Sequence, residues 1–307
     1  MPKSLAMEFL GRSYQNPLLP ASGCYANCHE AEAWVDLGKA WGGLVSKSVS
    51  LEPRAGNPGH RVAEAPAGLL NSIGLQNPGL TAFLAEHIEF LLAANPNLIV
   101  NIAGSSTAEY LQLVEALNPY DLAAIEVNLS CPNVSTGCMS IGTDPKQVEA
   151  LLKELSQVSR HPLIAKLTPN VAAIEPIAKA AEAGGAKALT VVNTFLGMAI
   201  DIKTRRPIFR RNTAGYSGPG IQPLALRLAA EACRAVQIPV IGVGGISRAE
   251  DVLAFIIAGC SLVQIGAAVL CDPLISEALQ KDLLLALDEL KIQNLAELKG
   301  SLKWYEN

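Results

Sequence analysis

The segment Pro239-Val-Ile-Gly-Val-Gly-Gly-Ile-Ser247 contains the pattern that decides the fold. A short apolar run with no polar alternation ends in two adjacent glycines, and a helical pattern follows. Such a run is typical of a parallel strand that is covered on both faces. Counting Pro239 to Val243, the chain has eight runs of this kind. The other seven are Leu18 to Ser22, Gly43 to Lys47, Asn97 to Ala103, Ala123 to Leu129, Pro162 to Leu167, Ala188 to Asn193 and Leu262 to Ile265.

Helical patterns fill most of the gaps between these runs. Asp144-Pro145 predicts a capped helix start with proline at the first helical position, and Pro223 predicts another start. Pro78 to Leu92 predicts a single helix. No linker divides the 307 residues. We therefore predict the α/β class and a (β/α)8 TIM barrel that forms one domain over residues 1–307. A doubly wound open sheet is the alternative, but no G-x-G-x-x-G follows the first run.

Composition excludes several classes of protein. Half of the residues are hydrophobic and 17% are charged, which indicates a large core rather than disorder. The net charge of −4 and the lack of a long basic run disfavour nucleic-acid binding. Seven scattered cysteines and no signal-peptide pattern predict free thiols and a cytoplasmic location. Cys24-x3-Cys28-His29 lacks the spacing of a haem or zinc motif, so we expect no metal site.

Val252 to Cys271 carries no charge and is about as long as a membrane span. Ser247 and Glu250 predict a capping box before it, and Ala258-Gly259 predicts a helix end within it. We therefore expect a buried helix followed by a buried strand, and no membrane association.

Polar residues gather where the predicted strands end. In a barrel these ends meet at the C-terminal mouth, and the long segments Ser48 to Gly79 and Thr194 to Gln222 should extend over it. One pocket is therefore expected to receive side chains from six strands. The residues at these ends are Ser22, Lys47, Ser48, Asn101, Asn128, Cys131, Lys166, Asn193 and Thr194.

The last two units end in glycine-containing turns, Gly244-Gly245 and Gly266-Ala267. Glycine lets backbone N–H groups approach phosphate oxygens, and this corner of a barrel often holds a phosphate. The four histidines (His29, His60, His87 and His161) do not end a strand. A pocket with a phosphate site, two lysines, several amides and a thiol fits flavin mononucleotide (FMN). A lysine near the flavin pyrimidine edge would stabilise the negative charge that appears on reduction.

Asn128-Leu-Ser-Cys-Pro-Asn-Val134 resembles the active-site motif of class 1 dihydroorotate dehydrogenases. The similarity extends from about Asn16 to Pro273. Gly197-Met-Ala-Ile-Asp201 and Gly142-Thr-Asp-Pro145 are closest to the NAD-linked B-type catalytic subunit. The other segments that agree with the family are Leu70 to Gly79, Asn193 to Asp201, Thr204 to Pro207 and Ser217 to Pro223.

The resemblance implies oxidation of (S)-dihydroorotate to orotate in pyrimidine (UMP) biosynthesis. A hydride would pass to one FMN per chain and a proton to Cys131, whose ordinary thiol pKa is near 8.5. Electrons would continue to NAD through a partner subunit that holds FAD and a 2Fe-2S cluster. A homodimer is implied, or a heterotetramer with that partner.

The same resemblance implies two sets of contacts. The implied FMN contacts are Ser22, Lys47, Ser48, Asn101, Asn128, Lys166, Val192, Gly218, Gly244, Gly245, Gly266 and Ala267. The implied substrate contacts are Lys47, Asn71, Ser72, Ile73, Gly74, Leu75, Asn128, Asn193 and Thr194.

The sequence departs from the family at two places. Ala267 replaces a threonine after the eighth strand, and Tyr216 replaces a leucine in Ala214-Gly-Tyr-Ser-Gly218. These departures leave the electron acceptor open between NAD, fumarate and another compound. A dihydropyrimidine dehydrogenase-like enzyme acting on uracil or thymine shares the Asn-Leu-Ser-Cys-Pro loop and is an alternative. A flavin-binding subunit without activity is another.

Overall fold

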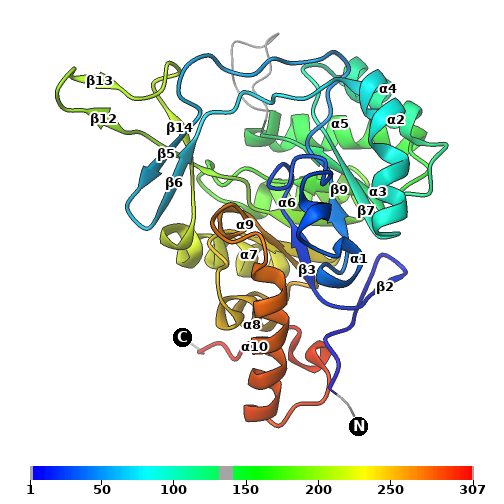
Figure 1. Ribbon diagram of the computed structural model, residues 1–307. Coiled ribbons are helices and arrows are strands. Elements are labelled where there is room, and N and C mark those ends of the chain that lie inside the picture. Colours follow the sequence, from blue (N-terminus) through cyan, green and yellow to red (C-terminus); the bar gives the residue numbers. More distant parts are fainter. Residues whose placement is uncertain (1–2, 131–140, 306–307) are drawn as a thin grey trace.

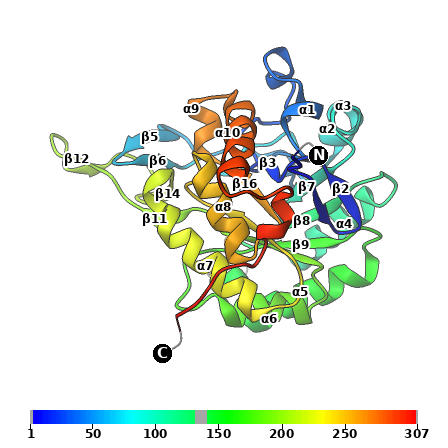
Figure 2. The same ribbon diagram turned by 90° about the horizontal axis from the view of Figure 1, so that it is seen from below.

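The computed structural model describes residues 3–130 and 141–305. Within them, eight strands form one parallel sheet in the order β3-β16-β15-β10-β9-β8-β7-β4, with helices around it (Figures 1 and 2). This is the predicted (β/α)8 TIM barrel. The barrel strands are β3 (Leu18–Pro20), β4 (Leu44–Val45), β7 (Leu98–Ile102), β8 (Ala124–Asn128), β9 (Leu163–Lys166), β10 (Ala188–Val191), β15 (Val240–Val243) and β16 (Leu262–Ile265).

Each barrel strand lies inside the run that predicted it, so all eight strand predictions are confirmed. Their residues are buried, as expected for strands covered on both faces. The helices are α1 (Leu37–Ala40), α2 (Leu80–Glu86), α3 (Ile88–Ala94), α4 (Thr107–Leu117), α5 (Pro145–Val158), α6 (Glu175–Ala183), α7 (Gln222–Ala235), α8 (Ala249–Ala258), α9 (Ala267–Cys271) and α10 (Ile275–Glu289), with 3-10 turns at Ala31–Ala33, Ile141–Thr143, Pro219–Ile221 and Leu295–Leu298.

The barrel closes where its first and second strands meet. The backbone N–H of Gly42, just before β4, donates to the carbonyl of Leu18 in β3 over 2.9 Å. A Cβ on Gly42 would lie 2.0 Å from the carbonyl oxygen of Asn16. Only glycine fits this approach, so the closing contact depends on Gly42.

Two helix predictions need correction. Pro78 to Leu92 forms two helices rather than one, because the backbone at His87 (φ −122°, ψ −35°) leaves the helical region between α2 and α3. The cap of α8 uses Asp251 instead of Glu250, and its carboxylate accepts from the N–H groups of Ser247 and Arg248. The predicted end at Ala258-Gly259 is correct, with Gly259 at φ +121°.

The uncharged stretch from Val252 to Cys271 contains the end of α8, β16 and α9. No helix in residues 3–130 or 141–305 has the length and apolar character needed to cross a membrane.

The two long segments predicted to cover the mouth pair with each other, which the sequence did not indicate. They build an antiparallel sheet in the order β11-β14-β6-β5, in which Asn71 of β6 faces Gly215 of β14. Figure 1 shows this sheet on the side of the barrel away from both chain ends. The remaining strands are β1 (Met7–Phe9), β2 (Arg12–Tyr14), β5 (Val62–Ala65), β6 (Gly68–Asn71), β11 (Phe195–Gly197), β12 (Ile200–Asp201), β13 (Arg206–Pro207) and β14 (Ala214–Ser217).

The predicted cap of α5 provides a test of the fold. The Asp144 carboxylate accepts from the backbone N–H of Lys146 over 3.0 Å and from the side chain of Gln147 over 3.2 Å. We expect Asp144→Ala to lower the free energy of unfolding by about 1 kcal/mol, as loss of an N-cap usually does. Urea denaturation measures this loss. Asp144→Asn keeps a capping oxygen and is the control; equal losses in both variants would contradict the role of the cap.

Candidate active site

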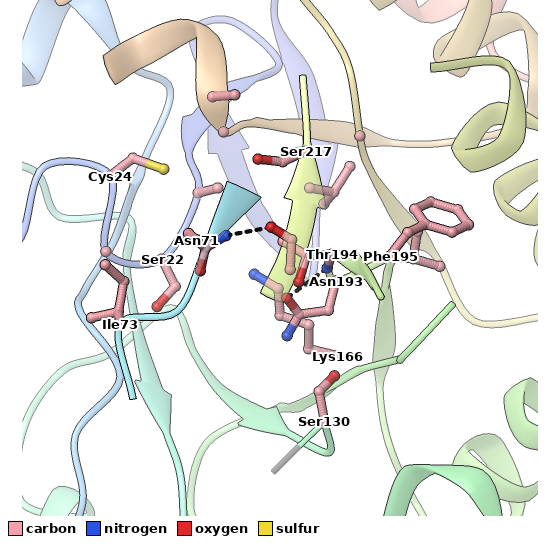
Figure 3. Close-up of a pocket in the computed structure, with 18 of the residues that line it drawn as sticks. Ser22, Cys24, Asn71, Ile73, Ser130, Lys166, Asn193, Thr194, Phe195 and Ser217 are labelled. Carbon is pink, nitrogen blue, oxygen red and sulfur yellow. Dashed lines mark hydrogen bonds between the residues drawn. The ribbon is translucent and has the colours of Figure 1, made fainter. Parts of the chain in front are cut away.

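One cavity of about 580 Å³ opens at the carboxyl ends of the barrel strands (Figure 3). This volume lies in the range of small-molecule and cofactor sites. Every predicted site residue that the structure describes lines this cavity, although the segments come from all parts of the chain. Their assignment to cofactor or substrate stays a prediction, and Cys131 lies outside the described residues. The lining residues include Ser22, Lys47, Ser48, Asn71, Ser72, Ile73, Gly74, Leu75, Asn101, Asn128, Lys166, Val192, Asn193, Thr194, Gly218, Gly244, Gly245, Gly266 and Ala267.

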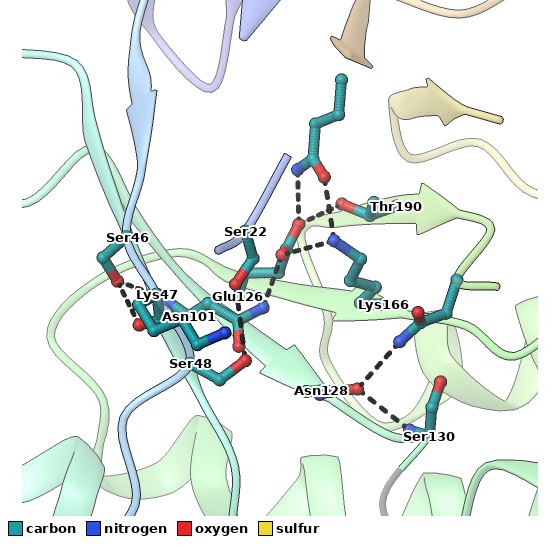
Figure 4. A network of polar contacts seen from close by, with 12 residues as sticks. Ser22, Ser46, Lys47, Ser48, Asn101, Glu126, Asn128, Ser130, Lys166 and Thr190 are labelled. Carbon is teal, nitrogen blue, oxygen red and sulfur yellow. Dashed lines mark hydrogen bonds and ion pairs between the residues drawn. The ribbon is translucent and has the colours of Figure 1, made fainter. Parts of the chain in front are cut away.

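Beneath the cavity lies a buried carboxylate, Glu126 of β8, with no exposed surface (Figure 4). Its Oε1 accepts from the Lys166 ammonium over 3.2 Å and from Asn101 Nδ2 over 2.6 Å. Its Oε2 accepts from Thr190 Oγ1 over 2.7 Å and from Gln264 Nε2 over 2.6 Å. Two carboxylate oxygens offer about four acceptor positions, so the protein fills all of them.

The surroundings of Glu126 favour its ionised form. Burial by itself raises the pKa of this carboxyl, but the charge of Lys166 and the hydrogen bonds from Thr190, Gln264 and Asn101 outweigh burial and lower the pKa below its usual value. The Glu126 carboxyl is therefore ionised at neutral pH.

Sequence analysis missed Glu126, Thr190 and Gln264. A signal for Glu126 was present, because a charged residue in the apolar run Ala-Ile-Glu-Val-Asn is costly unless it is paired. Its spacing of two residues from Asn128 also places both side chains on the same face of the strand. Gln264 stands in the same way inside the apolar run of β16.

The amides of the cavity have different environments. Asn128 Oδ1 accepts from the N–H of Ser130 over 3.2 Å and from Asn193 Nδ2 over 3.4 Å, which joins the ends of the fourth and sixth strands. Asn101 is fully buried, and its Oδ1 has no hydrogen-bond partner among the described residues. Because Asn101 lines the cavity, this buried acceptor can take a donor from a bound molecule or an ordered water.

The loop from Asn71 to Leu75 is held from outside the cavity. The Ile73 carbonyl accepts from the N–H of Asn57 over 2.9 Å, and the N–H of Ser72 donates to the Arg61 carbonyl over 2.7 Å. Asn71 Nδ2 donates to the Gly215 carbonyl over 3.2 Å. The antiparallel sheet β11-β14-β6-β5 and the segment before β5 thus hold this loop at the opening.

Lys47 and Cys24 lie together on one wall. The Lys47 side chain packs over Gly23, where a Cβ would approach its Nζ to 2.9 Å. Burial raises the pKa of the Cys24 thiol to about 11, and the charges of Lys166 and Lys47 offset only part of this effect. Cys24 was not predicted to line the cavity, and with this pKa it stays protonated at neutral pH. It is therefore a poor proton acceptor.

The glycine corner forms another part of the cavity wall. Gly244 and Gly245 have φ values of +135° and +71°, which side chains with a Cβ rarely adopt. A Cβ on Gly245 would lie 2.6 Å from the backbone N of Gln222. A Cβ on Gly266 would meet only the Cβ of Ala21, at 3.9 Å, so the backbone there faces open space. At Gly266 the corner can therefore receive an anionic group close to the main chain.

The four histidines are absent from the cavity wall. His29 and His87 contact each other elsewhere, with 2.9 Å between Nε2 and Nδ1. Residues 3–130 and 141–305 contain no cluster of three or more His, Cys, Asp or Glu side chains arranged to hold a metal ion.

Comparison with known proteins identifies the family. The dihydroorotate dehydrogenase family model matches residues 4–287. The chain belongs to the dihydroorotate dehydrogenase family. It is 43% identical over 300 residues to the "Dihydroorotate dehydrogenase B (NAD(+)), catalytic subunit" of Alkaliphilus oremlandii, covering 98% of this chain and 99% of that protein. A protein of the same name from a Geobacillus species is 45% identical over 297 residues, covering 96% and 95%. One from Listeria welshimeri is 45% identical over 296 residues, covering 96% and 97%.

In this member of the dihydroorotate dehydrogenase family, Lys47 in the cavity wall should lower the free energy of unfolding at neutral pH. Burial lowers the pKa of Lys47 from its usual value of 10.5, and Cys24 offsets this only in part. Between the lowered pKa and the pKa of the unfolded chain, the unfolded state binds more protons, so stability rises with pH. The cost of the buried charge is therefore largest at neutral pH. We expect Lys47→Met to be more stable than wild type at pH 7, and this advantage to shrink as the pH approaches 10.

Urea denaturation at a series of pH values measures the difference between the two proteins. Lys153→Met, at an exposed position on α5, is the matched control and should follow the wild-type profile. A Lys47→Met protein that is less stable than wild type at pH 7 would contradict the cost of this buried charge.

Proposed function

We propose that this chain oxidises (S)-dihydroorotate to orotate, a step of pyrimidine biosynthesis, with one FMN per chain. The observation that carries the proposal is the cavity itself, because the described residues to which the family resemblance gives cofactor or substrate contacts all line it. One large core cluster around that barrel, with only a small second cluster at Leu70, Phe209 and Ala214, supports one FMN-binding domain over residues 1–307.

The residues present fit FMN. The glycine corner at Gly244, Gly245 and Gly266 lines the cavity, and open space at Gly266 leaves room for a phosphate close to the main chain. On the floor, the unpartnered Asn101 Oδ1 can accept from the flavin N3–H. The Lys166 ammonium has three donors and gives two to Glu126 and Gln264, so the third is free for a flavin acceptor. A donor beside an acceptor matches the pyrimidine edge of a flavin.

Bound FMN would supply a hydride acceptor, and the chain's own residues would orient the substrate. Asn71, Asn128 and Asn193 carry amide groups that suit the carboxylate and ring amides of dihydroorotate. Thr194 is fixed next to them, since its N–H donates to Asn193 Oδ1 over 2.8 Å. Holding the substrate in one orientation lowers the entropy cost of the transfer. Lys47 adds a positive charge on the same wall.

The proton acceptor is proposed to be Cys131. This assignment rests on the family motif and on chain connectivity, because Cys131 directly follows Ser130, which lines the cavity. The high pKa of Cys24 supports the choice, since the other thiol at this cavity stays protonated at neutral pH.

The electron acceptor is proposed to be NAD, reached through a partner subunit that holds FAD and a 2Fe-2S cluster. The names of the relatives support this step, because each is a B-type, NAD(+)-linked catalytic subunit. The five described cysteines, including Cys24 and Cys260, are all free, which supports a reducing setting such as the cytoplasm. Fumarate is the alternative acceptor.

Anaerobic spectroscopy of the FMN-loaded protein tests the proposal. Dihydroorotate should bleach the flavin absorption, whereas dihydrouracil should not. Orotate should form in an amount equal to the flavin reduced. Bleaching by dihydrouracil alone would favour a dihydropyrimidine dehydrogenase-like enzyme, and no bleaching by either compound would favour a subunit without activity. Reoxidation by fumarate would contradict the proposed route to NAD.

The proposed base gives a second test. We expect Cys131→Ser to slow flavin reduction by dihydroorotate by about 100-fold or more at neutral pH, because a serine hydroxyl ionises far less readily than a thiol and so supplies almost no ionised base. Stopped-flow absorbance measures the rate. Cys271→Ser, at an exposed position, is the control and should reduce at the wild-type rate. A wild-type rate in Cys131→Ser would remove Cys131 from the mechanism.

A further inference from the structure

The buried carboxylate of Glu126 has no part in the proposed chemistry, yet the floor of the cavity is built around it. Its four partners come from β7, β9, β10 and β16, so with β8 the network joins five of the barrel strands (Figure 4). A charge placed so deeply is costly unless it is fully paired. Its presence beneath a cofactor cavity therefore calls for an explanation beyond packing.

Glu126 sets the direction of both groups that the floor presents. Lys166 Nζ is held from below by Glu126 Oε1 at 3.2 Å and Gln264 Oε1 at 2.9 Å, which leaves one N–H for the cavity. Asn101 gives its Nδ2 to Glu126 over 2.6 Å, so its Oδ1 is the end left for a ligand. Without the carboxylate, Asn101 would lose the hydrogen bond that orients its amide, and Lys166 would keep only its bond to Gln264.

Glu126 also compensates the charge of Lys166. Lys166 is only 5% exposed and Glu126 is fully buried, so solvent screens their fields weakly. Together they carry a net charge of zero beneath the cavity. A lysine alone would present a full positive charge to the ring above it, and that charge would favour the electron-rich, reduced form of a flavin.

We propose that Glu126 is a positioning residue that holds Lys166 and Asn101 against the flavin and, by compensating the lysine charge, keeps the reduction potential of the flavin low. This inference rests on the proposed function, because it takes FMN as the occupant of the cavity. A low potential would help the reduced flavin to pass its electrons onward to a weak oxidant such as NAD.

Reduction potentials of four FMN-loaded proteins test the inference. Wild type and the double variant Glu126→Gln/Lys166→Met carry no net charge at these two positions. Glu126→Gln leaves one positive charge, and Lys166→Met leaves one negative charge. The predicted order of potentials is Glu126→Gln highest, wild type and the double variant similar, and Lys166→Met lowest. Each step should be about tenfold in the equilibrium constant of two-electron reduction, or about 30 mV.

Thr190→Val is the matched control for structure alone. It removes the 2.7 Å hydrogen bond to Glu126 Oε2 but changes no charge. Its flavin potential should therefore differ from that of wild type by less than about 30 mV. Circular dichroism and flavin content would show whether each variant folds and binds FMN. If Glu126→Gln does not fold, the double variant remains decisive, because replacing both members of a buried ion pair is often tolerated. The reduction potential of the double variant must then exceed that of Lys166→Met.

Dye-linked anaerobic titration measures these potentials without requiring turnover. The inference would be overturned if the reduction potential of Glu126→Gln were at or below that of wild type. It would also be overturned if the potential of the double variant were no higher than that of Lys166→Met. Either result would leave the proposed function intact. Failure of wild type to bind FMN would instead overturn the cofactor assignment, and this inference with it.

Discussion

The Glu126–Lys166 ion pair inside the barrel is the interaction on which the site depends. It lies where β8 and β9 run side by side, in the register that pairs Glu126 with Ile164 and Asn128 with Lys166. The same carboxylate fixes the amide of Asn101 on the neighbouring strand. Stability alone does not account for such a pair, since well-packed apolar residues would serve a barrel core at least as well. The pair makes sense as the floor of a site that must present a donor and an acceptor in fixed directions.

Above this floor, the rest of the architecture supplies walls of different chemistry. The turns after β15 and β16 bring the main chain of Gly244 and Gly266 to the cavity, and the pairing of β6 with β14 holds the Asn71 loop against the opening. The Lys47 wall contributes a partly buried cation. A phosphate, a flavin ring and a small anionic substrate would each meet a separate part of the cavity. This division explains why the predicted cofactor and substrate residues come from nearly every barrel unit.

Much of this arrangement could be predicted from the sequence, for physical reasons. The apolar runs mark strands covered on both faces, and parallel strands place their carboxyl ends at one mouth, so residues as distant as Ser22 and Asn193 had to converge. Two kinds of feature were not predicted from the sequence. The break at His87 and the shift of the α8 cap to Asp251 depend on backbone geometry within a turn. The pairing of β6 with β14 depends on contacts between segments far apart in the chain.

The role of Glu126 was hidden for a related reason. Its charge is visible in the sequence, but the four partners that keep it ionised lie on four other strands, and only the closed barrel brings them together.

The most direct test of the account compares the binding of FMN and riboflavin to the apoprotein by fluorescence titration. The account predicts one FMN per chain, and binding of riboflavin at least 100-fold weaker, because riboflavin lacks the phosphate that the glycine corner would hold. Equal affinity for the two flavins, or no binding of either, would contradict it.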